Sequence, residues 1–210
     1  MPKITESKRE QRRNQILDAA LACFSEDGFH QTGMADIVQR SGLSHGAVYV
    51  YFKSKDDIIV ALAVDRHRQE ASLNAAIGPT DDPLDALRAL VRAYGRLLSD
   101  PAGEARRRVG VNGWAEALRN ERVRASVVEG IAAPIAIIVE LIERAKAMGS
   151  VSAEVESEVV ARALVALFQG FTLQAVWGQA IDLEAASAVV ERMIAGLSAD
   201  FRRAGRHGAR

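Results

Sequence analysis

The sequence predicts an all-α protein of about nine helices. Aromatic residues make up only 5% of the 210 residues, and strand-like alternation of apolar and polar side chains is absent. Apolar residues instead recur at helical spacing between short segments that carry capping residues, glycine or proline. A chain of this length can bury a full core, so one or two compact units are expected.

The first helix is expected to follow a capping box made by Ser7 and Glu10. Its apolar stripe continues until Gly28, which should end it. The lone Cys23 falls within this stripe and is expected to be a buried small hydrophobe. This helix should therefore brace the two that follow.

Two short helices separated by three residues come next and predict a helix-turn-helix. The first of them begins after Thr32 or Gly33 and ends at Gly42. Ser44 is the natural N-cap of the second, because its side-chain oxygen can accept from the first free backbone donors of a helix. In such a motif the second helix reads base edges in the major groove of DNA.

This candidate reading helix has an inner and an outer side. Val48 and Phe52 lie four residues apart and are expected to face inward. Two exposed tyrosines and a histidine on the other side indicate a binding surface rather than a merely solvated one. The residues expected to face outward are His45, Ala47, Tyr49 and Tyr51.

Six further helices are expected after residue 53. Each is bounded by a capping residue, a glycine or a proline. Pro134 lies inside the seventh helix, where the missing hydrogen bond and the steric clash cost about 3 kcal/mol, so a bend is expected there. The expected ranges are about 54–77, 83–99, 103–119, 120–148, 152–178 and 182–201, with breaks such as Gly78-Pro79 between them.

Residues 35–56 resemble the DNA-binding signature of the tetracycline-repressor (TetR) family, and the resemblance covers about residues 8–60. The sequence departs from the family pattern at Gly33, Ala47 and Val50, where a capping hydroxyl, a hydroxyl and an aromatic ring are common. These departures affect cap strength and base preference. The matching residues are Gly42, Ser44, Gly46, Tyr49, Phe52 and the turn Lys53-Ser54-Lys55.

The resemblance implies a three-helix DNA-binding domain at 1–53 and an effector-binding and dimerisation domain at 54–210. Tyr49 and Lys55 resemble the family's phosphate-contacting positions. By their chemistry, His45 and Tyr51 can reach a phosphate or a base edge, with packing against the first helix as the alternative for Tyr51. Further residues predicted to bind DNA are Ala47, which can meet a thymine methyl group, and Thr32 and Gly46.

Bulk charge does not indicate a nucleic-acid partner, because the formal net charge is zero. Residues 1–13, however, carry five basic and two acidic side chains, which gives 5 − 2 = +3. A basic arm beside the reading helix can contact phosphates, and a solvated tail is the alternative.

The eighth expected helix is apolar on more than one side and needs two neighbours. The resemblance implies that helices eight and nine pair with the same helices of a second chain as a four-helix bundle. A twofold pair would place two reading helices about 34–36 Å apart, as palindromic DNA requires. The alternative is that helix eight is simply central in a monomer.

A small-molecule site is predicted between helices five to eight. Aromatic side chains would line it and polar groups would orient the molecule, although aromatics at helical spacing are also ordinary core residues. The predicted lining residues are Trp114, Phe168, Phe171, Trp177, Tyr94, Asn112, Gln174 and His67.

Enzyme, metal and membrane functions are not predicted. The four histidines are scattered without metal-ligand spacing, and no catalytic or cofactor signature occurs. The first fifteen residues are charged, and the longest apolar run, 131–139, is too short for a membrane span, so neither a signal peptide nor a membrane is expected. A cytoplasmic protein without a cofactor is expected.

We therefore expect a homodimeric transcriptional regulator, a repressor released from operator DNA by a small, largely apolar effector. The first alternative is a DNA-binding regulator without an effector. The second is a helical-bundle ligand carrier or enzyme, which would bind DNA only non-specifically.

Overall fold

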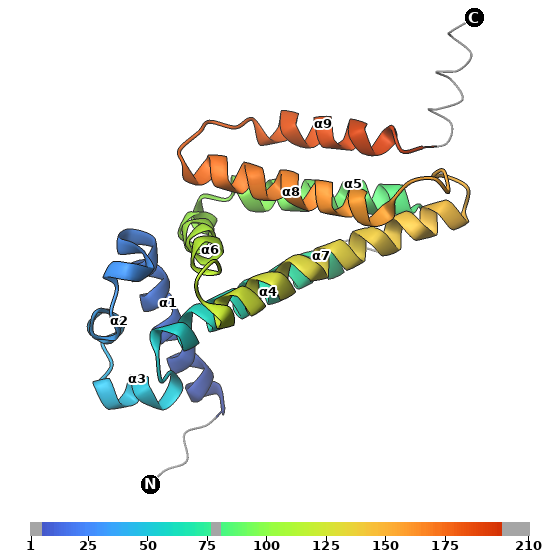
Figure 1. The fold of residues 1–210 in the computed structure, drawn as a ribbon. Coiled ribbons are helices and arrows are strands. Elements are labelled where there is room, and N and C mark those ends of the chain that lie inside the picture. Colours follow the sequence, from blue (N-terminus) through green and yellow to red (C-terminus); the bar gives the residue numbers. More distant parts are fainter. Residues whose placement is uncertain (1–5, 77–80, 199–210) are drawn as a thin grey trace, which may run out of the picture. The chain divides into compact units, whose positions relative to one another are not determined.

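The computed structural model describes residues 6–76 and 81–198, and the side chains of all of these except 69–76. Within these residues lie nine α-helices and one 3-10 helix, and the predicted all-α fold is confirmed (Figure 1). The elements are α1 (Glu6–Gln31), α2 (Met34–Ser41), α3 (His45–Tyr51), α4 (Lys55–Ala76), α5 (Pro83–Ser99), η1 (Pro101–Gly103), α6 (Glu104–Glu116), α7 (Glu121–Ala147), α8 (Ser157–Val176) and α9 (Leu183–Ala195).

The chain divides into two compact units. The first contains Met1–Arg68 and Glu104–Val128, and the second contains Gln69–Gly103 and Glu129–Arg210. In the first unit α1 packs against both α2 and α6, and in the second α5 packs against α8 and α9. The first unit therefore includes α6 and the beginning of α7, which come far later in the sequence than the reading helix. The functional division at residue 53 stays a prediction.

Side-chain caps begin several helices where the sequence predicts them. Ser44, Asp82 and Asp182 accept from backbone N–H groups of α3, α5 and α9 at 3.3, 2.8 and 2.9 Å. Asn120 Oδ1 accepts from the backbone N–H of Arg122 at 3.1 Å and so caps α7. These bonds satisfy backbone donors that have no partner inside a helix.

Some predicted bounds are wrong. Helix α1 already includes Glu6, so Ser7 is not its cap. Helix α8 starts five residues later than predicted, because the Ser152 carbonyl accepts from the Val155 N–H at 3.1 Å in a separate turn. Helix α6 ends at Glu116 and α9 at Ala195, both earlier than predicted. The predicted break at Gly78-Pro79 lies outside the described residues, and the bend at Pro134, within the continuous α7, stays a prediction.

The first unit has a core shared by α1, α2, α3, α4, α6 and the beginning of α7. Val48 and Phe52 are buried in it, which confirms their predicted inward direction. Phe24 and Phe29 meet edge to face in the same core, with ring centroids 4.8 Å apart. Cys23 is also buried as predicted, and burial raises the pKa of its thiol.

The second unit depends on close packing of α5 against α9. Gly95 lies at this contact, and a Cβ atom built there would stand 2.6 Å from Ser187 Oγ, well inside contact distance. That hydroxyl donates to the Leu183 carbonyl at 2.7 Å, so turning it away costs a hydrogen bond. A side chain at position 95 therefore either turns this hydroxyl away from its hydrogen bond or pushes the two helices apart.

Gly95→Ala is expected to lower the free energy of unfolding by about 1 kcal/mol, because overpacking outweighs the gain in helix propensity. The double variant Gly95→Ala with Ser187→Ala should recover at least the starting stability, since the obstructing hydroxyl is gone. Urea unfolding followed by circular dichroism measures both. Equal losses in the single and double variants would contradict this account of the contact.

Candidate nucleic-acid interface

The turn between α2 and α3 sets the direction of the reading helix. Gly42 ends α2 with φ 67°, a left-handed conformation that glycine adopts without strain. Gln15 Nε2 of α1 donates to the Ser41 carbonyl at 2.7 Å and ties this turn to the first helix. The side-chain cap at Ser44 then starts α3 in a fixed orientation. In Figure 1, α1, α2 and α3 are the dark to light blue helices.

The outer side of α3 carries a stacked pair of rings. His45 is exposed, and its imidazole lies 4.3 Å from the Tyr49 ring, centroid to centroid, at an interplanar angle of 24°. Tyr49 and Ala47 are half-buried, and Gly46 is exposed. Stacking restricts both rings, so each presents its polar atoms from a limited set of positions.

Three other predicted DNA contacts are engaged within the protein. Tyr51 is half-buried and packs against the first unit's core, so it is only partly outward and the packing alternative describes its ring. Thr32 is 2% exposed and its hydroxyl donates to the Gly28 carbonyl at 2.8 Å. Lys55 Nζ donates to the carbonyls of Phe29 and, at 3.0 Å, Thr32. Lys55 thus holds the turn before α2 against the start of α4.

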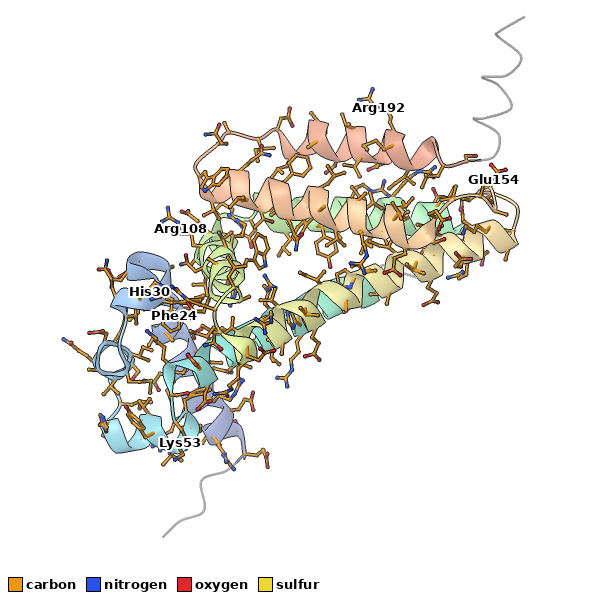
Figure 2. All side chains as sticks on the ribbon, viewed as in Figure 1. Phe24, His30, Lys53, Arg108, Glu154 and Arg192 are labelled. Atoms are coloured by element: carbon orange, nitrogen blue, oxygen red, sulfur yellow. The ribbon has the colours of Figure 1, made fainter. Side chains whose placement is uncertain are left out.

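Two side chains near the reading helix were not among the residues predicted to bind DNA. Val50 is 67% exposed. Its position two residues after the inward-facing Val48 could have indicated this exposure. Lys53, labelled in Figure 2, lies just beyond α3, and its Nζ donates to the Tyr49 carbonyl at 2.6 Å. A cation there favours the C-terminal end of a helix.

Cations around the motif are partly neutralised by fixed partners. Arg40 of α2 forms two bonds, 2.5 and 2.6 Å long, to the Glu26 carboxylate, and its guanidinium holds the pKa of Glu26 below the ordinary value. Arg13 pairs with Asp65 at 3.3 Å. Lys8 and Arg9 of the predicted basic arm are exposed, and Lys3 lies outside the described residues.

The beginning of α4 is fixed to the beginning of α7. Asp57 accepts from the backbone N–H groups of Lys53 and Ser54, both at 3.0 Å, and from Arg122 at 2.7 Å. Arg122, followed by the Lys53 N–H and the Ser54 side chain, lowers the pKa of Asp57 despite its partial burial. The end of the reading helix is therefore held from two directions.

This pKa shift predicts an acid-dependent part of the stability. Because the native carboxylate of Asp57 is harder to protonate than in the unfolded chain, its contribution is complete above the unfolded pKa, about 3.9, and is lost as pH falls through the lower folded value. The difference in free energy of unfolding between the wild-type chain and Asp57→Asn should shrink from pH 5 towards pH 3. Urea titrations measure it, with the exposed Asp18→Asn as control. A difference that stays constant over this range would contradict the assignment.

The predicted ligand residues are divided between the units. Trp114, Asn112 and His67 belong to the first, and the other five to the second. Tyr94 and Phe168 meet edge to face with ring centroids 4.7 Å apart. Their neighbour in α8, Phe171, is half-buried, whereas Gln174 and Trp177 are exposed. Asn112 Nδ2 donates to the Phe24 carbonyl at 3.5 Å, and His67 Nε2 lies 3.5 Å from Arg66.

Two further observations concern alternative functions. The part of the chain that the structure describes holds no group of three His, Cys, Asp or Glu side chains able to bind a metal ion. By length and composition alone, α7 and α8 are each apolar enough to cross a membrane.

The three-helix core, the glycine turn and the capped, partly exposed α3 define a helix-turn-helix protein. Residues 16–62 match the sequence profile of bacterial regulatory proteins of the tetR family. Residues 83–199, more than half of the chain, match that of the C-terminal domain of BetI-type transcriptional repressors. The chain belongs to the TetR family of bacterial regulators.

Individual relatives agree with this assignment. A helix-turn-helix transcriptional repressor of Mycobacterium tuberculosis is 33% identical over 93 residues, which are 44% of this chain and 48% of that protein. The transcriptional regulator BetI of Burkholderia lata is 37% identical over 95 residues, again 44% and 48%. The solved structure of Salmonella enterica GusR has a TM-score of 0.74 at 27% identity and covers 93% of this chain and 98% of that one. The match thus spans about half the length of these two curated relatives.

Proposed function

We propose that this chain is a sequence-specific, DNA-binding transcriptional repressor that acts as a homodimer on a palindromic operator and releases it when a small apolar molecule binds. The observation that carries the proposal is the stacked His45–Tyr49 pair on the outer side of a braced second helix of a helix-turn-helix. The repressor profile over residues 83–199 supports the direction of regulation. A bacterial protein that binds operator DNA would act in the cytoplasm.

The side chains of α3 divide into two proposed roles. Tyr49 is proposed to contact a DNA phosphate, and His45 a base edge or a phosphate. Both have polar atoms on the outer side of the helix. Gly46 and Ala47 allow the helix backbone to come close to the groove. Tyr51, Thr32 and Lys55 are proposed to hold α3 and its turn in place rather than to contribute the main contacts.

A second copy of the chain is proposed to bury the exposed apolar side chains of α8 and α9 in a dimer interface. Only 11% of the most apolar 18-residue window of α8 is buried, and Val159, Trp177, Val189 and Met193 are between 50% and 66% exposed. Such a surface needs a partner. A second chain fits better than lipid because membership of the DNA-binding family requires two reading helices for one palindrome.

The effector site is proposed on the second unit, at the α5–α8 contact. Tyr94, Phe168 and Phe171 are half-buried there, so they keep aromatic surface that an apolar molecule can cover. An effector that prefers the arrangement unsuited to DNA must weaken operator binding by the same factor by which DNA weakens effector binding. The participation of Trp114, Asn112 and His67 stays a prediction.

Selection of duplexes retained by the purified protein tests the first half of the proposal. Random duplex DNA is captured, amplified and sequenced, and the enriched duplex is titrated by fluorescence anisotropy. Enrichment of a palindrome bound at least about a thousandfold more tightly than scrambled DNA is expected. Equal affinity for all duplexes would refute sequence-specific binding and favour a carrier or an enzyme.

The fluorescent apolar probe 1-aminoanthracene tests the second half. Saturable binding should lower operator affinity by about 5- to 150-fold, the usual range of coupling between two sites. Phe168→Ala should weaken probe binding, whereas Arg162→Ala, at an exposed position of the same helix that was not predicted to bind a ligand, should not. Operator affinity that is independent of saturating probe and of other apolar compounds would favour the regulator without an effector.

A further inference from the structure

The outer side of α3 contains a strip without polar side-chain atoms beside the stacked rings. Gly46, Ala47 and Val50 are spaced three and four residues apart and so share one face of the helix. Val50 is 67% exposed, the most exposed large apolar side chain of the first three helices. The reading helix therefore presents a polar half, His45 with Tyr49, and an apolar half.

A single exposed valine on an ordinary surface carries no functional meaning. On a helix that enters the major groove it has one favourable counterpart, because the C5-methyl of thymine is the only methyl group that the four bases present there. Against a purine, Val50 would desolvate a donor or acceptor without replacing its hydrogen bond, and cytosine has no methyl group at C5. Thymine is therefore the base against which burial of this side chain is most favourable.

We propose that Val50, with Ala47 beside it, is a specificity-determining residue that reads thymine methyl groups. Each half of the operator then carries a thymine where it faces Val50, next to the base or phosphate contacted by His45. This inference rests on the proposed function and adds to it the kind of base that the apolar half of α3 selects.

Replacing thymine by deoxyuridine in the selected palindrome tests the proposal, because it removes the methyl group and keeps every hydrogen-bonding atom. Thymines are replaced one symmetric pair at a time and affinity is measured by anisotropy. At one of these pairs the affinity of the wild-type chain for the duplex should fall by about fourfold per half-site, or about fifteenfold for both half-sites. The reason is that burial of one methyl group is worth about 0.8 kcal/mol.

Variants of Val50 test whether the loss of affinity for deoxyuridine duplexes depends on this side chain. Val50→Ala should bind the thymine and deoxyuridine duplexes within about twofold of each other, and Val50→Ser, which is polar and lacks both γ-methyl groups, should also lose the preference. Val128→Ala, which shortens a valine of α7 that is 59% exposed, should keep the full deoxyuridine effect.

Two failures are distinguishable. If no palindrome is enriched, the proposed function itself fails. If a palindrome is bound specifically, but no deoxyuridine pair weakens binding or Val50→Ala keeps the wild-type sensitivity, methyl readout by Val50 is refuted while the regulator remains.

Discussion

Replacing both His45 and Tyr49 by alanine is expected to weaken binding to the selected operator by at least about a hundredfold without unfolding the protein. The two rings stack on each other at the outer side of α3, and neither belongs to the core of the first unit. A good base contact is worth about 1–3 kcal/mol, and a dimer loses each contact twice. Fluorescence anisotropy at fixed salt measures the change, because salt alone alters such affinities strongly.

Matched variants separate the roles of the two rings. Tyr49→Phe removes only the hydroxyl and should weaken binding to all duplexes alike, whereas His45→Ala should relax one base position. Leu118→Ala changes a side chain that is 85% exposed in the same unit and should leave affinity unchanged. Wild-type affinity in the folded double variant would refute the assignment of α3.

Glutamates on α8 and α9 are expected to convert the dimer into monomers. Val159→Glu with Met193→Glu places two charges on side chains that are 63% and 55% exposed in the single chain and proposed to be covered by its partner. Burying unpaired carboxylates is strongly unfavourable. The mass from analytical ultracentrifugation should halve, and operator affinity should fall to the non-specific range, micromolar or weaker.

The control for this variant is Val128→Glu, which adds a charge at a comparably exposed valine of the first unit. It should keep both the dimer and the operator affinity. A wild-type dimer in the α8–α9 variant would place the interface elsewhere, and a monomeric wild-type chain would remove the dimer from the proposal altogether.

Local chemistry explains what was predictable from the sequence. The caps at Ser44, Asp82 and Asp182 act on backbone groups two or three residues away, so the starts of α3, α5 and α9 follow from short segments. The inward direction of Val48 and Phe52 likewise follows from helical spacing. Family membership was predictable because its signature is equally local.

Long-range contacts explain what could not be predicted from the sequence. The bond from Asn112 to the Phe24 carbonyl joins residues 88 positions apart, and no periodicity indicates that α6 packs on α1. Lys55 matched a phosphate-contacting position, yet carbonyls 23 and 26 residues earlier hold its ammonium group. Motif matching gives the position of a side chain but not its tertiary partners.

Hydroxyl-radical footprinting of the selected palindrome tests the central claim most directly, namely that two copies of α3 dock in successive major grooves of one duplex. The account predicts two protected segments on one face of the DNA, centred about 10 base pairs or a small multiple of that apart, and both lost together in the His45/Tyr49 double-alanine variant. A single protected segment, or uniform protection that survives this variant, would contradict it.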